Sequence, residues 1–328
     1  MKCRALAAEI DRRALETDAY DAEKQWTAPS GQPVYPAPIK PEDITAEFLA
    51  DIPKRASFFT GWPPEGVILT GLGTALWRAV RPLSPALGVR LLARWWHRLQ
   101  REPSHYTGPT RDAARLLARR LERHLPVALR PPANFDGTDM DRLALCERLT
   151  AMHNLGVFRC LAASASPVIL EIGAGYGMLA AAVLEAFPTA VYLVVDIPSS
   201  LTLAGCYLAT RRRCRVAVCR APAGLSSGEV GLTLNTDLSA IEGRQITLAI
   251  NTLSFGEMNP AIVGRYAAFL RRNLAPTGFL FEQNFDNTHV GSENFCDPAA
   301  VLSRHLRLRA HERRRRYLKG VPRLWAMS

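Results

Sequence analysis

The sequence predicts an α/β fold in which helices cover both faces of a mostly parallel β-sheet, preceded by a mainly helical N-terminal region. Two observations lead to this prediction. From residue 168 onward, short apolar segments alternate with segments whose apolar residues recur at helical spacing. A glycine-rich turn joins the first of these strands to the first helix. Strands that alternate with helices form a parallel sheet packed between two helical layers.

Seven strands are expected in this second half. The expected strands are 168–171, 190–196, 215–219, 246–251 and 278–283, with a closing hairpin made by 305–317 and 321–327. The helices expected between them are 178–186, 200–212 and 261–273, and a longer helix at 139–162 leads into the first strand. The hairpin turns at Lys319 and Gly320, because glycine favours a tight reversal of the chain.

The first 132 residues differ in character. Prolines are dense between residues 24 and 64, which predicts an extended arm with one short helix near 41–50. Segments 87–99 and 111–125 carry leucine at helical spacing with arginine between, which is typical of amphipathic helices. We expect a division into an arm and helical region, 1–132, and a sheet-containing domain, 133–328. We further expect 67–125 to act as a lid.

Composition is that of a protein with a sizeable core, since 48% of residues are hydrophobic and 22% are charged. The seven cysteines contain no C-x-x-C pair, so neither a zinc site nor a disulfide framework is indicated. Neither a signal peptide nor a transmembrane segment is recognisable, which predicts a cytoplasmic location. The net charge of +11 could attract phosphorylated ligands or nucleic acid, or could reflect arginines on solvated helix faces.

The strongest local signal is the turn at residues 171–177, Glu-Ile-Gly-Ala-Gly-Tyr-Gly, directly after the first strand. Glycines allow a sharp turn and a close approach of backbone to a ligand. The dinucleotide fingerprint is G-x-G-x-x-G, and here the third glycine comes one residue early. Glu-x-Gly-x-Gly-x-Gly instead resembles the class I methyltransferase motif, which binds S-adenosylmethionine. Asp196 ends the next strand, where an acid can accept both ribose hydroxyls.

Three further stretches, 195–204, 250–258 and 279–284, carry a closer resemblance. Together they resemble the sugar O-methyltransferase family of bacterial glycan and natural-product pathways, over roughly 139–284. The stretch Asn-Thr-Leu-Ser-Phe-Gly-Glu-Met at 251–258 is its most specific part. The resemblance implies a Rossmann-like class I methyltransferase fold with a seven-stranded sheet. It also implies transfer of a methyl group from S-adenosylmethionine to a hydroxyl of a sugar or glycosylated small molecule.

Cofactor contacts are expected from residues 171–177, 196–197 and 251–254. Each of these segments lies at the carboxyl end of an expected strand, and these ends meet at one edge of the sheet. Asn251 can offer its amide to the methionine end of the cofactor. The expected cofactor-binding residues are Glu171, Gly173, Ala174, Gly175, Tyr176, Gly177, Asp196, Ile197, Asn251 and Ser254.

Methyl transfer to a hydroxyl needs a base that takes the hydroxyl proton. His289 is the first candidate, because it follows the fifth strand and Asp286 could orient it. Glu257 is expected to hold a sugar hydroxyl, and Glu257 and Glu282 are the carboxylate alternatives for the base. The oxygens of Glu257, Glu282 and Asp286 suit a divalent cation, but no ordered ligand spacing supports one, so no metal is predicted.

Two other functions stay open. One is a methyltransferase with another acceptor, either nucleic acid or another natural product. Only the positive charge favours nucleic acid, and the Asn-Pro-Pro-Tyr type of tetrapeptide that amino methyltransferases carry after the fourth strand is absent. A non-catalytic partner protein could keep the fold, although the intact glycine turn and Asp196 argue against it. The expected acceptor is a sugar-containing small molecule or a nucleotide- or lipid-linked sugar, not nucleic acid, and a homodimer is compatible with the sequence.

Overall fold

The computed structural model describes ten stretches of the chain: 2–19, 39–55, 111–133, 135–212, 214–218, 225–243, 245–286, 288, 296–312 and 320–327. Two compact units are present. The first contains Met1–Ile52, Met152–Arg313 and Lys319–Ser328, and the second contains Pro53–Ala151 and Arg314–Leu318. Most of the expected lid, 67–125, lies outside the described residues.

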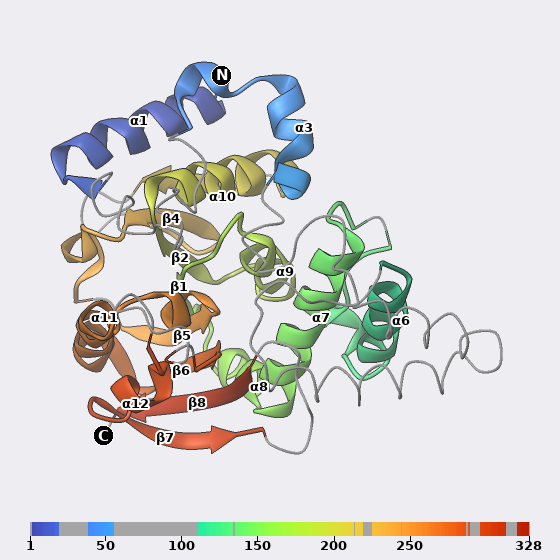
Figure 1. Ribbon diagram of the computed structural model, residues 1–328, viewed down its shortest axis with the longest axis vertical. Helices are drawn as coiled ribbons and strands as arrows, with labels where there is room; N and C mark the ends of the chain where they lie inside the picture. Colours follow the sequence, from blue (N-terminus) through green and yellow to red (C-terminus); the bar gives the residue numbers. More distant parts are fainter. Residues whose placement is uncertain are drawn as a thin grey trace. The chain divides into compact units, whose positions relative to one another are not determined.

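The first unit is built on an eight-stranded sheet in the order β3-β4-β2-β1-β5-β6-β8-β7 (Figure 1). Its strands are β1 Val168–Ile172, β2 Val191–Asp196, β3 Arg215–Val218, β4 Glu229–Leu234, β5 Ile246–Thr252, β6 Leu274–Asn284, β7 Leu306–His311 and β8 Val321–Met327. Neighbours from β3 to β6 are parallel, whereas β8 runs antiparallel to both β6 and β7.

This topology is the class I methyltransferase fold. Its seven core strands have the order β4-β2-β1-β5-β6-β8-β7, and the antiparallel β8 inserts between β6 and β7. The strand β3 extends the sheet at the far edge beyond β4. The expectation of a Rossmann-like, mostly parallel sheet closed by a hairpin is therefore confirmed.

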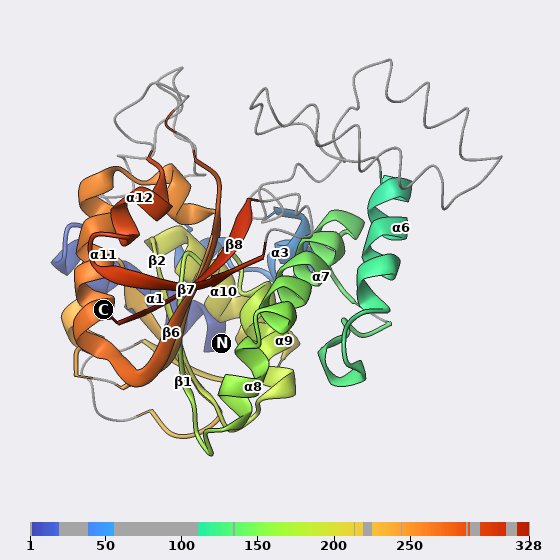
Figure 2. The same cartoon turned by 90° about the horizontal axis from the view of Figure 1, so that it is seen from below.

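Helices cover both faces of the sheet. Figure 2 shows α11, Pro260–Asn273, and α12, Pro298–Leu302, on one face, with α8, Val157–Ala162, and α9, Met178–Ala186, on the other. The burial of β1 and β2 is nearly continuous along both strands, as expected for strands that are covered on both sides. Among the described residues, no helix is both long enough and apolar enough to cross a membrane.

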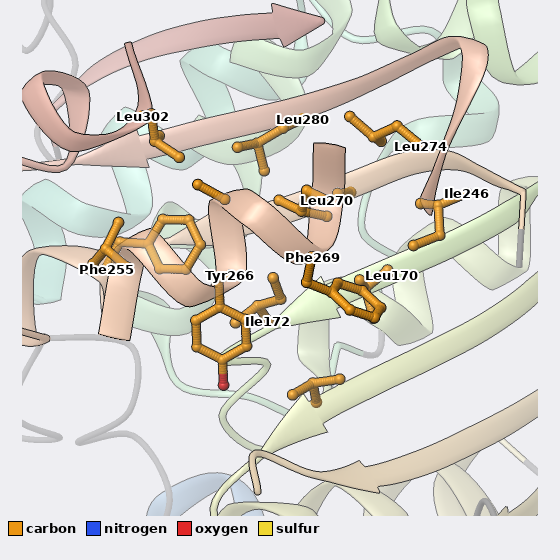
Figure 3. Close-up of a cluster of buried hydrophobic side chains, with 14 of the residues drawn as sticks. Leu170, Ile172, Ile246, Phe255, Tyr266, Phe269, Leu270, Leu274, Leu280 and Leu302 are labelled. Carbon is orange, nitrogen blue, oxygen red and sulfur yellow. The ribbon is translucent and has the colours of Figure 1, made fainter. Parts of the chain in front are cut away.

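A large part of the hydrophobic core lies between the sheet and α11 (Figure 3). Leu170 and Ile172 from β1 contribute to it together with Phe269 and Leu270 from α11, and all four are buried. Residues two apart in a strand share a face, so Ile169 and Glu171 belong to the opposite face of β1. The core therefore fixes which side chains of each strand point to α11.

The number of strands differs from the expected seven, because β4 was not recognised in the sequence. Glu229, Gly231 and Thr233 interrupt its apolar pattern, and glycine weakens a strand signal. The segment that was expected to be the third strand exists as β3, but it pairs with β4 and not with β2. β4 takes the place next to β2, so the end of β4, and not that of β3, adjoins Asp196.

The N-terminal segment forms a helix, α1 Lys2–Glu16, which packs along α10, Pro198–Arg211, in the first unit (Figure 1). The contact is tight, because a Cβ added to Gly205 of α10 would lie 2.5 Å from a methyl carbon of Leu6. Residues up to Ile52 thus belong to the unit that contains the sheet. This division differs from the boundary at residue 132 that composition suggested, because α1 finds its apolar partner surface on α10.

The described part of the second unit contains α6, Arg111–Glu122, and most of α7, Asp139–Asn154. Arg142 of α7 pairs with Glu122 of α6 at 2.5 Å and also donates to the carbonyl oxygens of Pro131 and Pro132. The helix expected at 139–162 is divided into α7 and α8 by Gly156, whose φ of 77° is left-handed. A glycine in this conformation commonly ends a helix.

Candidate cofactor site

The glycine turn begins directly after β1. Gly173, Gly175 and Gly177 have φ angles of 76°, 58° and 86°, a region that residues with a Cβ rarely adopt. Space also demands glycine at the first position, because a Cβ on Gly173 would lie 2.1 Å from Oγ of Ser254. The turn therefore brings bare backbone to the carboxyl edge of the sheet, where ligands bind in open α/β folds.

Asp196 ends β2 beside this turn. Its Oδ2 accepts a hydrogen bond from the backbone nitrogen of Gly175 at 3.1 Å, and its Oδ1 accepts one from Ile197 at 2.8 Å. Burial raises the pKa of Asp196 to about 7, although the amides of Ile197 and Gly175 and the hydroxyl of Ser200 oppose this shift. The amide of Ala174 opposes the shift as well, so four hydrogen-bond donors surround this carboxylate.

The end of β4 adds two residues that the sequence did not indicate. The backbone nitrogen of Asn235 donates to the carbonyl oxygen of Asp196 at 3.1 Å. Oδ1 of Asn235 is buried and has no hydrogen-bond partner among the described residues. Asp237 follows, and its carboxylate accepts a hydrogen bond from the hydroxyl of Ser239. The same carboxylate forms an ion pair with Arg13 of α1 at 2.5 Å. Recognition of β4 would have pointed to Asn235.

Tyr266 of α11 is a third residue that the sequence did not single out. Its ring packs against that of Phe255, with centroids 5.7 Å apart, and Figure 3 shows its hydroxyl pointing away from the ring cluster. Burial raises the pKa of Tyr266, and the charge of Asp196 raises it further. The side chains of Tyr266 and Asp196 therefore interact electrostatically at this edge of the sheet.

Asn251 is the penultimate residue of β5 and is fully buried. Its Nδ2 donates to the carbonyl oxygen of Ile172 at 2.8 Å and to Oγ of Ser254 at 2.6 Å. Its Oδ1 accepts from the backbone nitrogen of Phe255 and from Nδ2 of Asn284. Both amide hydrogens are thus engaged within the protein, so in this arrangement Asn251 holds the glycine turn and the following loop together.

The remaining residues of the turn have different environments. The carboxylate of Glu171 is buried and accepts a hydrogen bond from the hydroxyl of Tyr192 at 2.8 Å. The side chain of Tyr176 is also buried and packs edge-on against Tyr207 of α10. Ala174 is half-buried at the turn, and Ile197 is buried as the N-cap of α10.

The candidate catalytic residues are placed only in part. Glu257 is half-buried in the short helix η5, Ser254–Glu257, which follows β5. His289 lies outside the described residues. Oδ1 of Asp286, which was expected to orient His289, accepts hydrogen bonds from the backbone nitrogen and the hydroxyl of Thr288. Within the described ranges, no group of three or more His, Cys, Asp or Glu residues could hold a metal ion.

No protein-family model and no curated protein matches the chain. Three similar solved structures are the PH0226 protein from Pyrococcus horikoshii OT3, the pyocyanin biosynthetic protein PhzM and the glycopeptide N-methyltransferase MtfA. Their sequence identities to the chain are 14%, 15% and 16%, and their TM-scores are 0.41, 0.39 and 0.38.

The matched regions cover 54%, 58% and 54% of this chain, and 89%, 59% and 90% of the three proteins in the same order. The match with PhzM therefore spans less than two thirds of that protein. Similarities this low assign neither an acceptor nor a reaction to the chain. The fold is defined by its own strand order.

Proposed function

We propose that the chain binds S-adenosylmethionine at the carboxyl edge of β1, β2 and β4 and transfers its methyl group to a hydroxyl of a sugar or glycosylated small molecule. The pairing of Asp196 with the glycine turn is the observation that carries the cofactor assignment. The backbone of Gly175 and the carboxylate of Asp196 are joined by a hydrogen bond of 3.1 Å. A glycine-rich turn thus lies directly beside an acidic side chain.

Three chemical features fit this cofactor. The glycine turn offers backbone that an adenosyl group can approach closely. The carboxylate of Asp196 is an acceptor of the type that suits the two ribose hydroxyls. Oδ1 of Asn235, buried without a partner among the described residues, suits the exocyclic amino group of adenine. A buried acceptor without a donor is costly, so a ligand that supplies the donor would be favoured.

The sugar hydroxyl as acceptor is supported by the resemblance of residues 250–258 to sugar O-methyltransferases. In the proposed reaction, the acceptor oxygen attacks the methyl carbon and the carbon–sulfur bond breaks. The electron pair of that bond stays on sulfur, which becomes the neutral thioether of S-adenosylhomocysteine. The hydroxyl proton passes to a base, for which His289 is proposed, while Glu257 holds a sugar hydroxyl. Alignment of oxygen, carbon and sulfur supplies much of the rate.

Calorimetry with S-adenosylhomocysteine tests the cofactor assignment. Asp196→Ala should weaken binding by roughly 1–3 kcal/mol, the cost of losing a charged acceptor. Glu242→Gln is a suitable control, because Glu242 is exposed and precedes β5, at the opposite end of that strand from Asn251. Equal affinities for wild type and Asp196→Ala would exclude Asp196 from the site.

The acceptor class is tested with S-adenosylmethionine that carries a labelled methyl group. We expect label in free, nucleotide-linked or lipid-linked sugars and none in RNA or DNA. Label in nucleic acid would replace the proposed acceptor by the alternative that the positive charge favours. Tight cofactor binding without transfer to any acceptor class would instead indicate a non-catalytic partner protein.

A further inference from the structure

Four strands contribute one row of neighbouring residues at the carboxyl edge of the sheet. Ile172 of β1 pairs in register with Asn251 of β5, which pairs with Glu282 of β6, which pairs with Arg323 of β8. Residues in register point to the same face, and for this row it is the face that carries the core under α11. On this face, Asn251, Glu282 and Arg323 therefore place polar side chains beyond the apolar core, where the parallel strands end.

Glu282 is the centre of this row and is fully buried. Its Oε2 accepts hydrogen bonds from Nη1 of Arg323 at 3.1 Å and from Nε1 of Trp325 at 3.4 Å. Its Oε1 accepts one from Nδ2 of Asn284 at 3.0 Å. Burial raises the pKa of Glu282, while the nearby guanidinium of Arg323 opposes that shift. A buried carboxylate is expensive unless such donors surround it.

Asn284 links Glu282 to Asn251 by hydrogen bonds. Its Nδ2 also donates to Oδ1 of Asn251 at 2.9 Å, and its Oδ1 accepts from the backbone nitrogen of Gly256 at 3.2 Å. Asn251 in turn reaches the carbonyl oxygen of Ile172, the last residue of β1 before the glycine turn. A continuous chain of hydrogen bonds thus runs from the closing hairpin to that turn.

The loop after β5 is held by this chain. Leu253 has a φ of 72°, which is strained for a residue with a branched side chain. Its backbone nitrogen donates to the carbonyl oxygen of Gln283 at 3.0 Å. Further along the loop, the backbone nitrogen of Phe255 donates a hydrogen bond to Oδ1 of Asn251. The backbone nitrogen of Gly256 donates one to Oδ1 of Asn284. Strained backbone persists only where its surroundings fix it.

We propose that Glu282 and Arg323 are positioning residues that fix the loop 253–257 against the glycine turn and thereby shape the cofactor site. This inference rests on the proposed function and adds residues that do not touch the cofactor themselves. The charge of Glu282 orders Asn284, Asn284 orders Asn251, and Asn251 sets the distance between the loop and the turn.

Two readouts test the role of Glu282 in the variant Glu282→Gln, which keeps the size of the side chain but loses its charge. Hydrogen exchange should become faster at the amides of Phe255 and Gly256, because their acceptors lose their orientation. Affinity for S-adenosylhomocysteine should fall about 3- to 30-fold, the range typical of residues that act through a network. Unchanged exchange at both amides would overturn the inference, whether or not the cofactor binds.

Glu229→Gln is the matched control. Glu229 is a buried carboxylate that also pairs with an arginine, Arg215, at 2.9 Å, but it begins β4 and so lies at the amino end of the strands. The Glu229→Gln variant should leave both the hydrogen exchange at Phe255 and Gly256 and the affinity for S-adenosylhomocysteine unchanged. Equal losses in Glu229→Gln and Glu282→Gln would mean general destabilisation and would also overturn the inference.

Arg323 supplies a second pair of variants. Arg323→Met leaves the buried carboxylate of Glu282 without its cation, so the free energy of unfolding is measured together with each readout. Arg323→Met should reproduce the faster exchange, and Arg323→Lys, which keeps a positive charge, should restore part of the protection. Failure of the wild-type chain to bind S-adenosylhomocysteine would refute the proposed function. Normal binding by the wild type, Glu282→Gln and Arg323→Met alike would refute only the positioning role.

Discussion

The backbone nitrogen of Gly175 donates a hydrogen bond to the carboxylate of Asp196 over 3.1 Å, so the turn after β1 and the acid that ends β2 form one structural unit. The two residues come from neighbouring parallel strands whose carboxyl ends share an edge of the sheet. Any change in the charge of Asp196 therefore acts on the glycine turn as well as on the proposed cofactor.

Cofactor affinity should depend on pH because of Asp196. Its pKa is raised to about 7 by burial, so the carboxylate gains a proton as the pH falls through that value. A protonated acid is a poorer acceptor for ribose hydroxyls, and the affinity for S-adenosylhomocysteine should fall by up to about tenfold per pH unit below 7. Titration calorimetry between pH 5.5 and 8.5 measures this slope, which Asp196→Asn should abolish. A flat profile for the wild type would contradict it.

Stability without ligand should have the opposite pH dependence. The pKa of Asp196 is higher in the folded than in the unfolded chain, where it is about 3.9. Between these two values the folded state binds more protons, so this group makes the free energy of unfolding fall as the pH rises from about 4 to about 7. Urea unfolding of wild type and Asp196→Asn across that range should show the variant lacking this decline. Parallel curves would contradict the raised pKa.

Gly173→Ala should lower both stability and cofactor affinity. The new methyl group would lie 2.1 Å from Oγ of Ser254, and the backbone φ of 76° would be strained in alanine. Gly243→Ala is the matched control, because Gly243 has a φ of 77° but no atom within 4 Å of an added Cβ. Each should lose about 1–2 kcal/mol from the left-handed backbone. Only Gly173→Ala should lose additional free energy of unfolding, because its new methyl group meets Ser254. Equal losses for the two variants in urea unfolding would show that Ser254 moves aside without cost.

Catalysis should separate His289 from Glu257. If His289 takes the acceptor proton, His289→Ala should lower turnover by about 10²–10⁴-fold and barely change cofactor affinity. The pH–rate profile should also lose its limb near the histidine pKa. Glu257→Gln should mainly raise the KM for the acceptor. Full activity in His289→Ala together with loss of turnover in Glu257→Gln would assign the base to Glu257.

Local patterns predicted the main features of the sheet but not all of its strands. The strands next to the glycine turn are apolar and β-branched, and their alternation with helices indicated a parallel sheet. β4 was missed because Glu229, Gly231 and Thr233 break the pattern, although its burial is complete. The helix α1 was missed because its buried face includes the small residues Cys3, Ala7 and Ala14, which give a weak hydrophobic signal.

The candidate site was predictable only where it is local in sequence. Gly175 and Asp196 belong to a motif with fixed spacing, so they could be named in advance. Asn235 could not be named, because its place beside Asp196 depends on the register of a strand that was not recognised. Arg323 reaches Glu282 across 41 residues of sequence, and no local pattern encodes that contact.

The packing of α1 on α10 has a consequence for how the chain folds. Arg13 pairs with Asp237 across 224 positions, so α1 cannot complete its contacts until the chain up to Asp237 has been made and most strands of the sheet have formed. Contacts so distant in sequence slow folding, because the entropy of closing a long loop is lost before these contacts can stabilise the chain. Docking of α1 is therefore expected to be a late step, and interrupted synthesis would leave an amphipathic helix exposed to aggregation or to chaperones.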